Sequence, residues 1–152
     1  ETVLTLARQL FDQTKELHGL GGRARVLLAA AALLHDVGVA VNNDGHHKHS
    51  QYLIQSSELV GLSDEERHLV ALLARYHRKA PPAREHEEFM ALRRRERSLV
   101  ERLAALLRLA DALDRQHGAV VRGVSVKIRE DCVELRPMLA GDPGTRLTLE
   151  QK

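Results

Sequence analysis

Residues 24–38 read ARVLLAAAALLHDVG, and the architecture that we expect is built around this segment. From Ala24 to about His35 it is apolar almost all round, which predicts a helix buried at the centre of a bundle. The helix ends on His35 and Asp36, with Gly38 close behind, so two ligand-type side chains stand at the end of a buried element. Because burial of unpaired polar groups is costly, both side chains must find partners.

Other segments with helical spacing surround this one. Apolar residues from Val3 to Leu17 predict a first amphipathic helix, and Ser63 with Glu66 forms a capping box that starts a helix running to His77. We also expect a short helix after the turn at 42–45, a charged helix over 84–97, and a long helix over about 96–117 that carries Asp111 on its inner edge. Helix therefore dominates the predicted fold.

The pattern changes beyond Gly118. Apolar and polar residues alternate over about 122–137, which predicts a β-hairpin, and residues 147–149 could add a further strand. We therefore expect a mainly α fold, a helical bundle over about 1–117 with a hairpin appended, as one domain spanning 1–152. The abrupt ends of the chain suggest a piece of a longer protein.

Composition agrees with this reading. Leu, Ala and Val supply most of the 43% apolar residues, and aromatic residues make up 3%, which favours closely packed helices. No stretch approaches the roughly 20 apolar residues that span a bilayer, so no membrane partner is expected. Cys132 is the single cysteine, which rules out an internal disulfide and is consistent with a reducing cytoplasm. Nearly absent aromatics and a net charge of +2 make nucleic acid a poor candidate ligand.

Polar residues at the ends and edges of these helices are the candidate site. A single buried histidine is more often a hydrogen-bonded structural residue than a ligand. Here, however, imidazoles and carboxylates on separate helices can converge on a divalent metal, which leaves Mg, Mn, Fe or Zn open. The candidate ligands are His35, Asp36, His49, His77 and Asp111.

Two strings in the sequence resemble the HD superfamily of metal-dependent phosphohydrolases. They are AALLHDVG at 31–38 and LRLADALDR at 107–115. The resemblance implies that His35, Asp36 and Asp111 are catalytic metal ligands, whereas Asp114 is a weaker match. Members of this superfamily usually carry another ligating histidine on the first helix, at a position that would fall just before Glu1; His18 is a poor substitute for it.

A more selective resemblance covers nearly the whole chain. The strings LFD at 10–12, HKHSQYLI at 47–54, LVGLS at 59–63 and RYHRK at 75–79 are similar to the C-terminal half of exopolyphosphatase/guanosine pentaphosphate phosphatase proteins. This resemblance implies a parent chain whose actin-like N-terminal domains remove terminal phosphate from polyphosphate or guanosine pentaphosphate with Mg²⁺.

Two functions follow as hypotheses. In the first, His35, Asp36 and Asp111 hold one cation and His49 with His77 a second, in a site that hydrolyses phosphoanhydrides. In the second, the chain is a noncatalytic module that binds polyphosphate and forms a homodimer. Planar guanidinium groups suit paired phosphate oxygens, although basic runs are often only solvated helix faces. The candidate substrate-binding residues are Lys48, His49, His77, Arg78 and Lys79.

Overall fold

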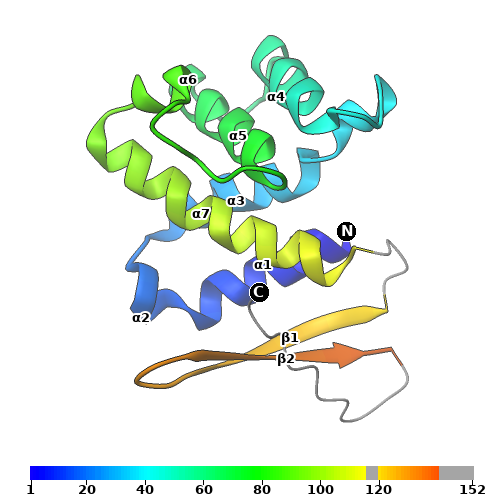
Figure 1. Ribbon diagram of the computed structural model, residues 1–152, viewed down its shortest axis with the longest axis vertical. Coiled ribbons are helices and arrows are strands. Elements are labelled where there is room, and N and C mark those ends of the chain that lie inside the picture. Colours follow the sequence, from blue (N-terminus) through cyan, green and yellow to red (C-terminus); the bar gives the residue numbers. More distant parts are fainter. Residues whose placement is uncertain (116–119, 141–152) are drawn as a thin grey trace.

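The computed structural model describes residues 1–115 and 120–140, and these form a helical bundle with a two-stranded hairpin (Figure 1). The mainly α prediction is confirmed. The elements, in chain order, are α1 (Thr2–Gln13), α2 (Lys15–His18), α3 (Gly22–Leu34), the 3-10 turn η1 (Val37–Ala40), α4 (His46–Ser56), α5 (Asp64–Tyr76), α6 (Glu87–Met90), α7 (Arg94–Leu113), β1 (Val121–Ile128) and β2 (Val133–Leu139).

Helix α3 lies at the centre of the bundle, where it packs against α1, α5 and α7. Leu28 of α3 is fully buried in the hydrophobic core, to which the neighbouring helices contribute Leu6, Leu72 and Leu103. The central position agrees with the prediction from its sequence, but part of its apolar surface is exposed, and Leu33 keeps 59% of its surface accessible. Three neighbouring helices cover only part of its circumference.

The helix ends follow their sequence signals with small differences. Ser63 and Glu66 form the predicted capping box, in which Ser63 N donates to Glu66 Oε2 at 3.0 Å. The first predicted helix is divided at Thr14 into α1 and α2. In the charged segment 84–97 only the single turn α6 and the start of α7 are helical. Helix α7 ends at Leu113, short of the predicted end at about 117, because Asp114 and Arg115 form a turn.

The hairpin is confirmed, and it lies at the end of the molecule opposite α4 and α5 (Figure 1). Two glutamine side chains of α1 hold β1 as a neighbouring strand would. Gln9 Oε1 accepts from Val124 N at 2.8 Å, while Gln13 Oε1 accepts from Val126 N at 2.9 Å and Gln13 Nε2 donates to Val124 O at 2.9 Å. The predicted strand over 147–149 lies outside the described residues. Of the helices described, none has the length and apolar character needed to cross a membrane.

Candidate metal centre

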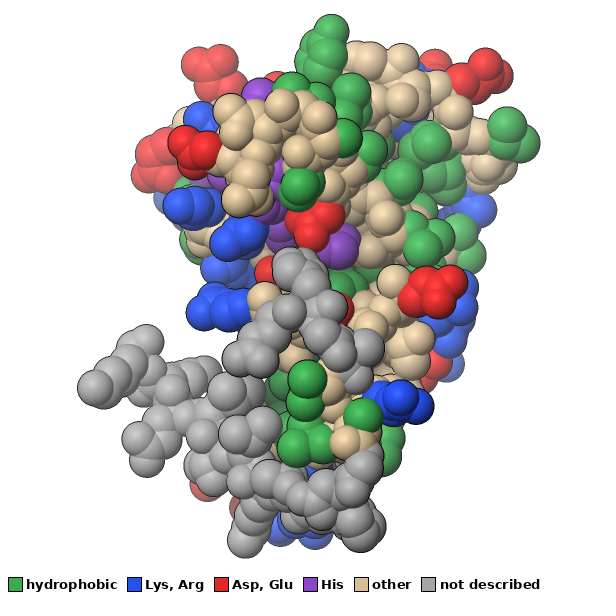
Figure 2. Space-filling view, turned by 90° about the vertical axis from the view of Figure 1, so that its right-hand side faces the viewer, with side chains coloured by type: hydrophobic (Ala, Val, Ile, Leu, Met, Phe, Trp, Pro, Cys, Tyr) green, Lys and Arg blue, Asp and Glu red, His purple; other side chains and the backbone are tan. Residues whose placement is uncertain are grey.

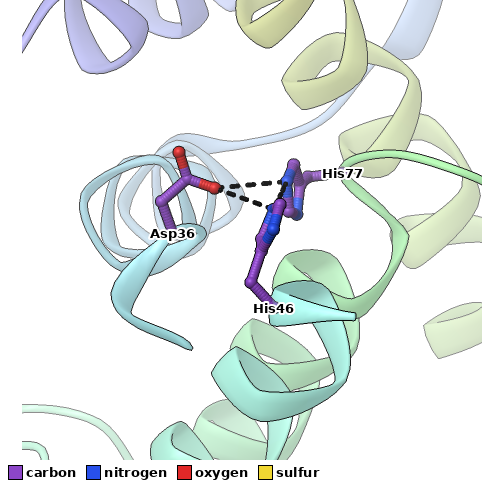
Figure 3. A group of neighbouring side chains, drawn as sticks. All are labelled: Asp36, His46 and His77. Atoms are coloured by element: carbon purple, nitrogen blue, oxygen red, sulfur yellow. Dashed lines mark hydrogen bonds and ion pairs between the residues drawn. The ribbon is translucent and has the colours of Figure 1, made fainter. Parts of the chain in front are cut away.

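Asp36 is the central side chain of the site, directly after the end of α3. Its Oδ1 atom lies 3.2 Å from His46 Nε2, at the start of α4, and 3.4 Å from His77 Nε2, at the end of α5. Figure 3 shows the two imidazoles facing this oxygen from separate helices. The two imidazole Nε2 atoms are themselves 3.3 Å apart.

The second oxygen of Asp36 faces another pair of residues. Asp36 Oδ2 lies 3.3 Å from His35 Nε2, and the same nitrogen lies 3.6 Å from Asp111 Oδ1 on α7. The described residues therefore contain two groups of candidate metal ligands, Asp36 with His46 and His77, and His35 with Asp36 and Asp111. Asp36 belongs to both groups, one oxygen to each.

All three imidazoles are held in the same way. The Nδ1 atom of each lies within hydrogen-bonding distance of the backbone carbonyl three residues earlier: His35 with Ala32 at 2.9 Å, His46 with Asn43 at 2.8 Å, and His77 with Ala74 at 2.6 Å. A carbonyl can only accept, so Nδ1 carries the proton and Nε2 of the neutral ring carries a lone pair. Every Nε2 points into the cluster, which is the orientation that metal-ligating histidines adopt.

Gly38 allows α4 to approach close enough to bring His46 into the site. Gly38 N donates to Ser50 Oγ at 2.9 Å, and Ser50 is fully buried. A Cβ atom at position 38 would lie 2.2 Å from the backbone oxygen of His46 and 2.4 Å from the nitrogen of Ser50. No side chain fits in that space, so glycine is required at the contact between η1 and α4.

The electrostatics of the site favour positive charge. Burial opposes the charged ring of His35, but the nearby carboxylates of Asp111 and Asp36 outweigh it and raise its pKa to about 9. Burial acts to raise the pKa of Asp36, yet its contacts with His35 and the other imidazoles lower it to about 2. His77 responds in the opposite direction, because burial lowers its pKa to about 4 and leaves its ring neutral at pH 7. Asp111 keeps a lowered pKa despite its burial, mainly through His35.

The residues of the first group, Asp36, His46 and His77, fit a bound cation. Bonds of about 2.1 Å to one cation place neighbouring ligand atoms about 3.0 Å apart at octahedral angles and about 3.4 Å apart at tetrahedral angles. The three separations found here, 3.2, 3.3 and 3.4 Å, fall in this interval. In addition, Asp36 Oδ1 and His35 Nε2 are buried atoms without a hydrogen-bond partner among the described residues. Buried polar atoms of this kind call for an ion or another partner.

The sequence identified four of the five residues that meet here. Four of the expected residues converge: His35, Asp36, His77 and Asp111. His49, which was expected to be a ligand of a second cation, belongs to neither group. His46 takes that position instead. The reason is the packing of α4: the Cβ of His49 lies 2.8 Å from the point where a Cβ on Gly38 would be, so this side of the helix faces η1. The only signal for His46 was its place at the helix start, beside two other histidines.

His18 makes two contacts within the fold. Its Nε2 is 2.9 Å from Phe11 O, and its Nδ1 accepts from Leu20 N at 2.9 Å. Both ring nitrogens therefore have protein partners, so His18 is a structural residue at the end of α2.

Exposed basic side chains adjoin the histidines. Lys48, Arg78 and Lys79 are exposed, and Figure 2 shows Lys and Arg side chains beside histidines on one face of the molecule. Burial, followed by the positive charges around it, lowers the pKa of His47 to about 4. The loop after α5 is fixed by Arg108 of α7, which donates to Tyr76 O at 3.2 Å and Lys79 O at 3.0 Å.

A family model and individual related proteins both indicate the same family for this chain. The family model described as Ppx/GppA phosphatase, domain III, matches residues 1–139. A guanosine-5'-triphosphate,3'-diphosphate pyrophosphatase of Pseudoalteromonas atlantica is 34% identical over 110 residues, which cover 72% of this chain and 21% of the relative. A protein of the same name from Aliivibrio fischeri is 29% identical over 157 residues, covering 99% of this chain and 30% of the relative. The chain thus spans less than a third of the length of these relatives.

Proposed function

Because this chain belongs to the Ppx/GppA phosphatase family, in which it corresponds to domain III, we propose that it is a metal-binding phosphohydrolase domain of a larger phosphoanhydride-hydrolysing protein. One observation carries the proposal: three imidazoles, each fixed through Nδ1 to a backbone carbonyl, direct Nε2 toward a shared carboxylate. A structural histidine has protein partners on both ring nitrogens, as His18 does: its Nε2 donates to Phe11 O and its Nδ1 accepts from Leu20 N.

Each ligand would have a distinct place in this centre. His35, Asp36 and Asp111 would hold one divalent cation, and Asp36, His46 and His77 a second, with Asp36 as the bridging carboxylate. Such cations polarise phosphoryl oxygens and make an attacking water more acidic. Three imidazoles favour Fe, Mn or Zn over Mg, whose preferred ligands are oxygen atoms.

The remaining residues would bind and orient the substrate. Asp36 and Asp111 keep 32% and 21% of their side-chain surface exposed, whereas His77 is fully buried, so a substrate would reach the centre from the carboxylate side. Arg78 and Lys48 would offset the charge of the phosphates. This arrangement suits substrates with several linked phosphates.

The identity of the substrate is proposed from the family. The two relatives are named for guanosine 5'-triphosphate 3'-diphosphate, and the family model names a phosphatase. We therefore infer that the parent protein hydrolyses guanosine polyphosphate or inorganic polyphosphate in the cytoplasm. We also infer that further N-terminal domains of the parent protein take part in this reaction.

The test is metal content together with phosphate release. Protein purified under metal-replete conditions should contain bound transition metal by inductively coupled plasma mass spectrometry, and His35→Ala and Asp111→Ala should lower both metal content and phosphate release from polyphosphate. His68→Ala is the matched control, because His68 contacts Gln55 away from the cluster. Wild-type protein that stays free of metal under these conditions would refute the proposal.

A second candidate is a noncatalytic polyphosphate-binding and dimerisation module. The observation in its favour is that, among the described residues, no carboxylate lies within 4.0 Å of Lys48, Arg78 or Lys79, so these charges remain available to a polyanion. Binding of this kind weakens steeply with salt as counterions are released. Polyphosphate affinity that is retained in metal-free protein and falls with salt would favour this function over hydrolysis.

A further inference from the structure

Among the described residues, Arg78 is the one lysine or arginine whose side chain lies within hydrogen-bonding distance of a member of either ligand group. It follows His77 directly, and its Nη1 atom lies 3.4 Å from His46 Nε2. This separation exceeds the usual range of about 2.7–3.2 Å for such hydrogen bonds, so the contact is weak. No carboxylate of the described part of the chain lies within 4.0 Å of Arg78.

The contact uses the same lone pair that a metal would use. His46 Nδ1 is committed to Asn43 O, so Nε2 is the only acceptor on the ring. A guanidinium group has donors and no acceptor, and it does not lose its proton in proteins. Arg78 and a cation therefore cannot occupy His46 Nε2 at the same time.

The backbone on both sides of Arg78 is held by hydrogen bonds from Arg108, so a change in its contact with His46 is expected to come from the side chain. Arg108 donates to the carbonyl of Tyr76 on one side and to that of Lys79 on the other. Leaving His46 therefore requires rotation of the Arg78 side chain without rearrangement of the loop. Once free, the guanidinium would stand beside a doubly charged cation, and an anion between the two would relieve their repulsion.

We propose that Arg78 is a substrate-phosphate ligand that metal binding displaces from His46, so that metal loading and phosphate binding strengthen one another. The inference rests on the proposed metal centre and adds a coupling to it. With a cation held by Asp36, His46 and His77, the released Arg78 would grip a phosphoryl oxygen through its planar fork. Coupling between two ligands is reciprocal, so phosphate must raise metal affinity by the same factor by which metal raises phosphate affinity.

The experiment measures equilibrium binding of Mn²⁺ by calorimetry, with and without inorganic phosphate. In wild-type protein, saturating phosphate should raise Mn²⁺ affinity by about fivefold or more. Arg78→Gln should bind Mn²⁺ about threefold more tightly than wild type without phosphate, because the competitor for His46 is gone and only a weak hydrogen bond is lost. The same variant should lose the gain from phosphate. A merely structural role for Arg78 would lower both affinities.

Two further variants keep the test specific. Arg78→Lys retains the charge and should keep part of the phosphate effect, whereas Arg84→Gln removes an exposed arginine elsewhere and should behave as wild type. Equal Mn²⁺ affinity in wild type and Arg78→Gln, or a phosphate effect that persists in Arg78→Gln, would overturn the inference and leave the metal centre standing. A wild-type protein that binds no Mn²⁺ at either group would overturn both.

Discussion

Replacing Gly38 with alanine should disrupt the group of Asp36, His46 and His77 and leave the group of His35, Asp36 and Asp111 in place. The added Cβ would lie 2.2 Å from the backbone oxygen of His46, whereas ordinary contacts lie at 3.4 to 4 Å, so α4 must retreat by more than 1 Å from η1. Overpacking of this kind costs about 1–3 kcal/mol. Weakening the hydrogen bond from Gly38 N to Ser50 Oγ adds about 1 kcal/mol.

The retreat of α4 would move His46 away from Asp36 while leaving the other group in place. Metal–ligand distances tolerate changes of only about 0.2 Å, so a shift of α4 exceeds what the Asp36, His46 and His77 group can absorb. His35 and Asp36 follow α3 and Asp111 lies on α7, whereas the three nearest atoms that a Cβ at position 38 would meet all belong to α4. Gly38→Ala should therefore bind one cation per chain, whereas we expect the wild type to bind two.

Metal content per chain and thermal unfolding test this prediction together. For a domain of this size, each kcal/mol lost should lower Tm by about 2–4 °C. Gly22→Ala is the matched control, because a Cβ there would meet nothing within 4 Å. The reasoning would be refuted if Gly38→Ala kept the full metal content, or if it lost both cations while remaining folded.

Four further substitutions should have distinct effects. Asp36→Asn should abolish metal binding at both groups, whereas Asp111→Asn should abolish it only at the His35 group, which metal analysis and calorimetry can compare. The hydrogen bond from Arg23 lowers the pKa of Glu66 from 4.5 to about 2. The stability from this pair should thus be fully present above pH 4.5 and be lost as pH falls toward 2, and Arg23→Gln should flatten this acid limb in denaturant unfolding. Gln13→Ala removes two hydrogen bonds to β1 and should speed amide exchange over residues 121–128 without changing metal content, since no residue of either ligand group lies in α1 or in the hairpin.

Local patterns predicted the helices well, because spacing and caps act within a few residues. The capping box at Ser63 and the alternation in β1 are signals of this kind, and both are confirmed. The exposure of Leu33 could not be predicted in the same way. An apolar helix is consistent with burial on all sides, and only the number of neighbouring helices decides how much of it is covered.

The sequence alone likewise could not show that His46, and not His49, lies in the ligand groups. Both lie in the same helical turn of α4, so spacing alone places them on neighbouring faces. What separates them is the contact with η1, where Gly38 meets the backbone of His46 and Ser50. A site built from several helices depends on such contacts, whereas the adjacent pair His35 and Asp36 depends only on where α3 ends.

The ends of the helices explain why the ligands gather where they do. Helix α3 ends at Leu34 and α5 at Tyr76, so His35 and His77 each follow the C-terminal end of a helix, where the dipole places partial negative charge. Asp111 lies in the last turn of α7 and adds a full charge near a third such end. Positive charge is therefore favoured at the point where these ends meet, whether it comes from a proton on His35 or from a metal. The same negative charge repels an anionic substrate. We accordingly expect phosphate to bind more tightly once cations have reversed the local charge, which is the direction of coupling that the displacement of Arg78 also predicts.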